Sequence, residues 1–137
     1  MSSDPIDVFV VVPVYNEQDS IDGVVDEWLA ALRQCAGRFV LCLINDGSTD
    51  GSLEKIRHLA DRHAEIQVVD KQNSGHGQSC MLGYRMAVER GAVSTLQVDS
   101  DGQCDPAWLP GFIERHSERN CVFGVRVRRD DGVLRLW

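Results

Sequence analysis

Short, continuous apolar runs separated by stretches of helical periodicity constrain the fold of this chain more than any other feature. The first run, 8–12, reads VFVVV, and comparable runs occupy 39–44, 66–69, 95–98 and 121–125. A strand that is apolar at consecutive positions must be covered on both faces, which is typical of parallel sheets. We therefore expect five strands in a mostly parallel sheet.

Apolar residues between these runs recur with the period of an α-helix. Between the first two runs, every position on one face of the expected helix is apolar: Ile21, Val24, Val25, Trp28, Leu29 and Leu32. Further helices are expected over 53–60 and 80–90, and a fourth that opens with Asp105 at the N-cap and Pro106 at the first helical position. This alternation predicts an α/β fold, a mostly parallel sheet with helices on both faces, in a single domain over 1–137.

Charge and composition exclude several classes of protein. With 14 Lys and Arg against 21 Asp and Glu, the net charge of −7 would repel a phosphate backbone, so no nucleic-acid partner is expected. No apolar stretch approaches the roughly 18 residues that span a bilayer, and residues 1–7 lack the features of a signal peptide. The five cysteines show no zinc-type spacing. A cytoplasmic location with reduced thiols is the prediction.

Unusual polar segments follow three of the expected strands. They are 13–17 (PVYNE), 45–50 (NDGSTD) and 99–103 (DSDGQ). The carboxyl ends of parallel strands meet at one edge of a sheet, and ligands bind there near the point where the strand order reverses. Three polar loops at one edge therefore predict a binding site.

The segment 99–103 is a candidate metal site. In extended backbone Asp99, Asp101 and Gln103 would project to the same side of the chain. Oxygen ligands of this kind favour a hard divalent ion such as Mg²⁺ or Mn²⁺. The alternative is that these residues only form a turn before the Asp105 cap.

Three residues of the other loops could receive a nucleotide. Asp46 is placed to accept from a nucleobase N–H, Tyr15 to stack on a base, and Glu17 to accept from base or sugar. Glu17 is also explained by the preference of a helix N-terminus for acidic residues. Asp50 is expected to cap the helix that contains Leu53.

The segment 73–78 (NSGHGQ) is expected to be a loop that lets phosphate or sugar approach the backbone, with His76 an ordinary loop residue. It is no dinucleotide fingerprint, because it follows the third strand and lacks a third glycine. Arg126, at the end of the fifth expected strand, could pair with a diphosphate. A nicotinamide-dependent oxidoreductase is disfavoured by the missing fingerprint, and a phosphoacceptor receiver domain by the missing acidic pair after the first strand.

Taken together, the segments 11–17, 44–50, 73–77 and 99–103, with 124–126 after them, resemble family-2 glycosyltransferases of the GT-A type. The closest subgroup is the dolichol- or polyprenyl-phosphate sugar synthases. The resemblance implies a metal-assisted, inverting transfer of a sugar from a UDP- or GDP-sugar donor to an acceptor such as a polyprenyl phosphate. Asn45 departs from the family pattern, since many members carry a second Asp there.

The resemblance also implies roles for individual residues. Those implied to line the donor pocket are Pro13, Tyr15, Glu17, Ile44, Asp46, Asp99 and Ser100. Asp99, Asp101 and Gln103 would hold the metal, and Arg126 would contact a phosphate of donor or acceptor. The catalytic base has no assigned position.

The apolar final residues 133–137 carry no cap or turn signal. Because the family's acceptor-binding half and membrane-anchoring segments would lie beyond residue 137, we expect the donor-binding half of a longer enzyme. Its membrane association would come only from that missing part, at the cytoplasmic face. By itself, this chain is expected to show no sugar transfer. The alternative is a fragment that binds a nucleotide sugar without turnover, or an inactive remnant.

Overall fold

The computed structural model describes residues 4–116 and 121 as an α/β fold. Its four strands are β1 (Val8–Val14), β2 (Phe39–Asp46), β3 (Ile66–Lys71) and β4 (Ser94–Gln97), all parallel in the order β3-β2-β1-β4. The helices are α1 (Ile21–Cys35), α2 (Ser52–Arg62), α3 (His76–Glu89), the short 3₁₀ helix η1 (Pro106–Trp108) and α4 (Leu109–Arg115). The fifth expected strand, 121–125, and Arg126 lie outside the described residues, except for Cys121.

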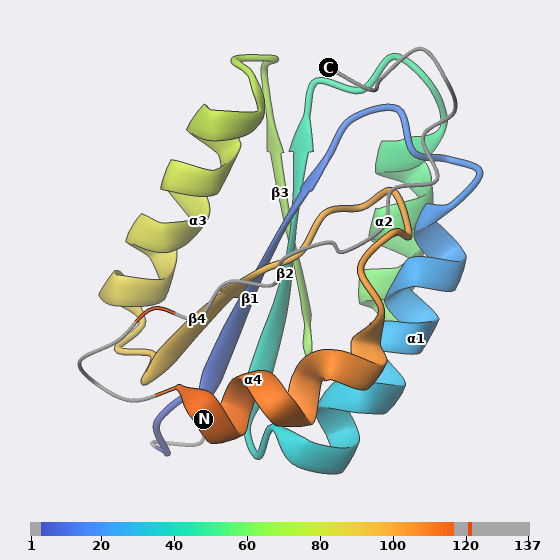
Figure 1. Ribbon diagram of the computed structural model, residues 1–137. Coiled ribbons are helices and arrows are strands. Elements are labelled where there is room, and N and C mark those ends of the chain that lie inside the picture. Colours follow the sequence, from blue (N-terminus) through green and yellow to red (C-terminus); the bar gives the residue numbers. More distant parts are fainter. Residues whose placement is uncertain (1–3, 117–120, 122–137) are drawn as a thin grey trace, which may run out of the picture.

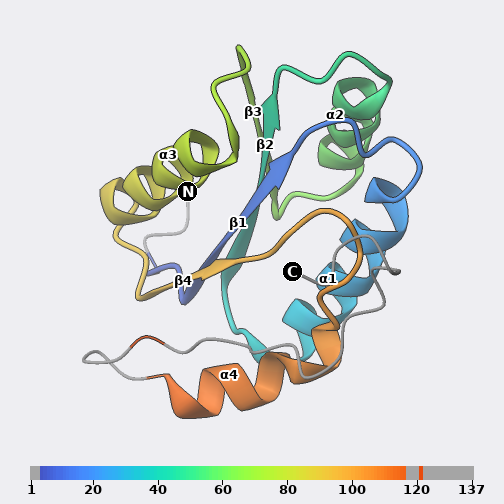
Figure 2. The same cartoon turned by 45° about the horizontal axis from the view of Figure 1, so that its top comes forward.

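Helices cover both faces of the sheet, as predicted (Figures 1 and 2). α3 packs on one face, where Phe9 and Val11 of β1 meet Ala87 of α3. α1, α2 and α4 pack on the other face, toward which Val10 and Val12 point. β1 is buried at all seven positions because it is central and covered on both sides. Its continuous apolar sequence follows from that placement.

The apolar face predicted for the first helix is confirmed. All of its members are buried against the sheet: Ile21, Val24, Val25, Trp28, Leu29 and Leu32. Each large side chain buried in this way contributes about 1.5–3 kcal/mol of transfer free energy. Among the described residues, no helix combines the length and the apolar character that crossing a membrane requires.

Two helix starts differ from the sequence prediction. α3 begins at His76, four residues before the expected start, because Gly75 takes a φ of +98° that ends the preceding loop and allows the helix to begin at once. Gly83 lets α3 lie close to β1, since a Cβ at this position would overlap the Val11 side chain. At α2 the cap residue is Gly51 rather than Asp50, although Asp50 Oδ1 still accepts from the Ser52 N–H at 2.9 Å.

The prediction for the fourth helix is confirmed in its capping. Asp105 Oδ1 accepts from the Ala107 N–H at 2.9 Å, and Pro106 occupies the first helical position. The first turn is 3₁₀ before α4 continues from Leu109, which is buried beside α1. The burial of Leu109 against α1 anchors the chain that follows the polar segment 99–103.

Candidate functional site

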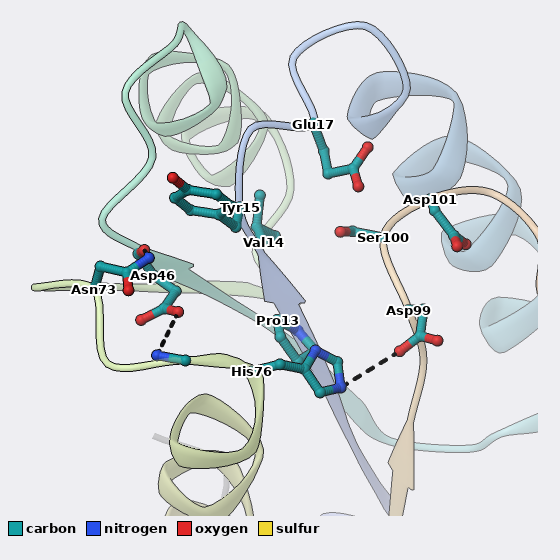
Figure 3. A pocket seen from close by; sticks show the side chains of 11 residues that line it. Pro13, Val14, Tyr15, Glu17, Asp46, Asn73, His76, Asp99, Ser100 and Asp101 are labelled. Carbon is teal, nitrogen blue, oxygen red and sulfur yellow. Dashed lines mark hydrogen bonds and ion pairs between the residues drawn. The ribbon is translucent and has the colours of Figure 1, made fainter.

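A pocket of about 360 Å³ opens at the carboxyl ends of the strands, where the strand order reverses between β1 and β4. Its lining comes from the ends of β1 and β2, the start of α3 and the segments that follow β1, β3 and β4 (Figure 3). The lining residues are Pro13, Val14, Tyr15, Glu17, Asp46, Asn73, Gly75, His76, Asp99, Ser100 and Asp101. The edge of the sheet that the sequence predicted is therefore the edge that carries the pocket.

The pocket brings together most of the residues singled out from the sequence: Pro13, Tyr15, Glu17, Asp46, Asp99, Ser100 and Asp101. Ile44 is absent from the lining, because it is fully buried in the core between the sheet and α3. Gln103 does not line the pocket either. Arg126 lies outside the described residues.

The loop after β1 is locked to the loop after β2 through Asn16. Asn16 adopts a φ of +51°, which is uncommon for a residue with a side chain. Its N–H donates to Ser48 Oγ at 3.0 Å, and its Oδ1 accepts from the Thr49 N–H at 2.8 Å. These bonds hold the strained backbone in place, so that neighbouring Tyr15 stands half exposed at the pocket wall.

Glu17 connects the same loop to the segment after β4. Its N–H donates to Ser52 Oγ at 2.8 Å, and its carboxylate accepts from the Ser20 hydroxyl at 2.9 Å. The Ser20 hydroxyl also lies 3.2 Å from the carbonyl oxygen of Ser100. Glu17 precedes α1 by four residues, so its contact with Ser20 serves the pocket wall as well as the helix start.

The Asp46 carboxylate is almost completely buried, with 4% of its side chain exposed. Its Oδ1 lies 2.5 Å from Lys71 Nζ and accepts from the Ser74 N–H at 2.9 Å, while Oδ2 accepts from the Gly75 N–H at 3.0 Å. Burial on its own raises the pKa of Asp46, but the hydrogen bonds from Lys71 and the two backbone N–H groups outweigh it and hold the pKa below its ordinary value. Asp46 is therefore a carboxylate at neutral pH.

Lys71 is a functional candidate that the sequence reasoning missed. It lies directly opposite Asp46 in the β2–β3 ladder, and its side chain is 18% exposed. Besides Asp46, its ammonium reaches Ser74 Oγ at 2.5 Å, the Gln72 carbonyl at 3.0 Å and Ser79 Oγ at 3.4 Å. The only sequence signal was a lysine two residues after the third apolar run.

The extended conformation expected for 99–103 is wrong. The backbone turns at Ser100 and Asp101, and Gly102 has a φ of +79°. Asp101 Oδ1 accepts from the backbone N–H of Gln103 at 3.0 Å, a local turn typical of Asp. The turn directs Asp99 and Asp101 to the pocket but does not bring the Gln103 side chain with them.

His76 faces the acidic segment across the pocket. Its Nε2 lies 3.8 Å from Asp99 Oδ1 (dashed line in Figure 3). The expectation that His76 is a simple loop residue is wrong, because it is the first residue of α3 and lines the pocket. Within 4–116 and 121, no three His, Cys, Asp or Glu side chains gather closely enough to hold a metal ion by themselves.

Fold and pocket together define an α/β protein whose ligand site lies at the carboxyl ends of a parallel sheet. The family model described as glycosyl transferase family 2 matches residues 9–137, and the chain belongs to this family. The resemblance noted in the sequence is thereby confirmed.

Curated relatives match over nearly the whole chain. The undecaprenyl-phosphate 4-deoxy-4-formamido-L-arabinose transferase of Pectobacterium carotovorum is 34% identical over 139 aligned positions, covering 98% of this chain and 41% of the relative. The protein of the same name from Pseudomonas aeruginosa PAO1 is 33% identical over 137 positions, with 97% and 40% covered. The chain thus spans about 40% of the length of these relatives.

Solved structures share the fold. A crystal structure of S. aureus TarS 1-349 in complex with UDP-GlcNAc has a TM-score of 0.62 at 24% identity, covering 81% of this chain and 32% of that one. The mannosyltransferase PcManGT from Pyrobaculum calidifontis, in complex with GDP-Man and Mn²⁺, has a TM-score of 0.58 at 21% identity, covering 72% and 28%. These similarities support the GT-A type of α/β fold expected from the sequence.

Proposed function

We propose that the chain forms the donor-binding part of a glycosyltransferase that moves a sugar from a nucleotide diphosphate donor to an acceptor. The observation that carries the proposal is the pocket, which joins an aromatic side chain, a buried carboxylate and three further acidic residues at the switch point of a family-2 domain. Its volume of about 360 Å³ falls within the range of small-molecule sites.

The two sides of the pocket suit the two ends of such a donor. Tyr15 and Asp46 lie on one side (Figure 3), where a base could stack on the ring and donate to the carboxylate. Asp99 and Asp101 lie on the other side, toward which the diphosphate would extend. Glu17 and Ser100 lie between them and are within reach of the ribose.

A divalent cation fits the diphosphate side. Asp99 and Asp101 offer carboxylate oxygens, the ligands that Mg²⁺ and Mn²⁺ prefer, and a diphosphate would supply the ligands that these two side chains lack. The structural neighbour crystallised with GDP-Man also contains Mn²⁺. When bound, the ion would neutralise charge on the leaving diphosphate. The Gln103 side chain does not line the pocket, so it is not among the proposed ligands.

For the acceptor we propose a polyprenyl phosphate, because the matched relatives are named undecaprenyl-phosphate transferases. Such an acceptor is anchored in a bilayer, so the site would work beside a membrane, at its cytoplasmic face. Transfer with inversion needs the acceptor oxygen in line with the leaving diphosphate, and no described residue is assigned as its base. Arg126 stays a proposed phosphate ligand.

Calorimetric titration with UDP and GDP in the presence of Mn²⁺ tests donor binding. At least one nucleotide should bind, and Asp101→Asn should remove most of the Mn²⁺-dependent part of the affinity. Asp61→Asn, a matched change at an exposed carboxylate of α2, should leave that part unchanged. If the chain without substitutions binds neither UDP nor GDP, the proposed function is contradicted.

Turnover is tested separately with a radiolabelled nucleotide sugar and undecaprenyl phosphate. Label that becomes extractable into organic solvent indicates transfer to the lipid. We expect no labelled lipid from these 137 residues alone, because they span about 40% of the length of the matched relatives. Nucleotide binding without labelled lipid in a longer parent chain would instead indicate a binding module without turnover.

A further inference from the structure

The acceptor capacity of Asp46 is limited before any ligand arrives. A carboxylate offers about four lone-pair positions, two on each oxygen. Lys71 Nζ and the Ser74 N–H both lie on Oδ1, and the Gly75 N–H lies on Oδ2. Among the described contacts, Oδ1 is thus filled and Oδ2 keeps one position. Asp46 lines the pocket, so this position is the one open to a ligand.

Lys71 is fixed on Oδ1 by its other contacts. Its ammonium is surrounded by the hydroxyls of Ser74 and Ser79 and the carbonyl of Gln72, in addition to the carboxylate. These oxygens come from the loop before α3 and from α3 itself, and the side chain is only 18% exposed. When a ligand binds, the Lys71 ammonium therefore already occupies Oδ1 of Asp46.

Nucleobases differ in how many donors they present to a carboxylate. Uracil has one ring N–H between two carbonyls. Guanine has a ring N–H beside an amino group, two parallel donors that match both oxygens of a free carboxylate. With Oδ1 filled, the amino group of guanine would have no acceptor and would point toward the ammonium of Lys71, and an unpaired buried donor is costly.

We propose that Lys71 is a positioning residue that makes the pocket prefer a base with a single donor, of the uracil type, over guanine. The inference rests on the proposed function, in which Asp46 receives the base. It makes a uridine diphosphate sugar the favoured donor class. The size of the preference follows from one unpaired donor, about tenfold or more in affinity.

The decisive comparison uses the unaltered chain and inosine diphosphate, which has the purine size and ring N–H of guanosine diphosphate but lacks the amino group. With Mn²⁺ present, inosine diphosphate and UDP should each bind about tenfold or more tightly than GDP. Equal affinities for inosine diphosphate and GDP, or tighter binding of GDP, would overturn the inference while leaving nucleotide binding itself established. Binding of none of the three would instead remove the proposed function.

Variants then assign the preference to Lys71. Lys71→Met opens Oδ1 to the guanine amino group, so the ratio of inosine to guanosine diphosphate affinity should fall to within about threefold, whereas Lys71→Arg keeps a cation there and should retain the ratio. Lys55→Met, at the exposed lysine paired with Asp22, should also retain it. Loss of affinity for all nucleotides at an unchanged ratio would show that Lys71 has only a structural role.

Discussion

Replacing Lys71 by methionine should destabilise the folded chain by about 2–3 kcal/mol. The Lys71 ammonium lies 2.5 Å from Asp46 Oδ1, with 18% and 4% of the two side chains exposed. The change removes a charged hydrogen bond, worth about 1.5–3 kcal/mol, from a carboxylate that stays buried. Two backbone N–H groups continue to hold Asp46, so the cost should stay below the roughly 3–5 kcal/mol of an uncompensated buried charge.

Urea unfolding at neutral pH measures this loss, and a double-mutant cycle isolates the pair. The cycle combines Lys71→Met, Asp46→Asn and the double variant, and we expect a coupling free energy of about 1.5 kcal/mol or more. Lys55→Met is the matched control, because its ion pair with Asp22 at 3.1 Å has 42% and 54% of the side chains exposed. Exposed pairs of this kind contribute less than about 1 kcal/mol.

A coupling below about 0.5 kcal/mol would refute the reasoning, since distant and independent sites already add to within that margin. It would mean that the loop before α3 is held to β2 by its backbone hydrogen bonds alone. A loss for Lys55→Met as large as that for Lys71→Met would likewise show that burial of the pair is not the cause.

Three further outcomes follow from the geometry. Because the folded-state pKa of Asp46 is lowered, the carboxylate should stabilise the fold fully above its ordinary pKa of about 4, and this stabilisation should be lost as the pH falls through the folded-state pKa. The free energy of unfolding in urea, measured between about pH 6 and pH 2, should therefore decrease less steeply for Asp46→Asn than for the unaltered chain. Gly47→Ala should cost about 1–3 kcal/mol in chemical unfolding, because φ is +68° and a Cβ would lie 2.6 Å from Asn73 N, and a change under about 0.5 kcal/mol would contradict that approach. Gly83→Ala should cost about 1–3 kcal/mol by pressing α3 off Val11, and an unchanged midpoint in thermal unfolding would argue against the contact.

The elements of the fold could be predicted because burial dictates their pattern. A central parallel strand needs apolar residues on both faces, and β1 has them; a helix on a sheet needs one apolar face, and α1 shows it. The start of α3 was missed because a segment with Gly75 and Gly77 around His76 is typical of a loop. In the structure Gly75, with its positive φ, is instead the N-cap residue of the helix.

The site could be predicted at the level of loops but not of contacts. Polar residues after parallel strands must share one edge, so Tyr15, Asp46 and Asp99 were found. The Asp46–Lys71 pair depends on the register between β2 and β3, which the sequence does not state. The projection of Gln103 depends on a turn at 100–102 that replaces the extended backbone.

The strand order also governs how the domain assembles during synthesis. Val8 lies opposite Phe39 of β2 on one side and Ser94 of β4 on the other. One edge of β1 can therefore pair with β2 early in synthesis, whereas the other edge can pair with β4 only after α3 has been made. The ribosome releases β1, β2 and β3 first, and these can pair while the acidic segment of the pocket is still unsynthesised. Until β4 arrives, β1 presents an apolar edge that can pair with another chain. Docking of β4 therefore completes the pocket and covers the apolar edge of β1 in one step, and conditions that slow this docking should raise concentration-dependent losses on refolding.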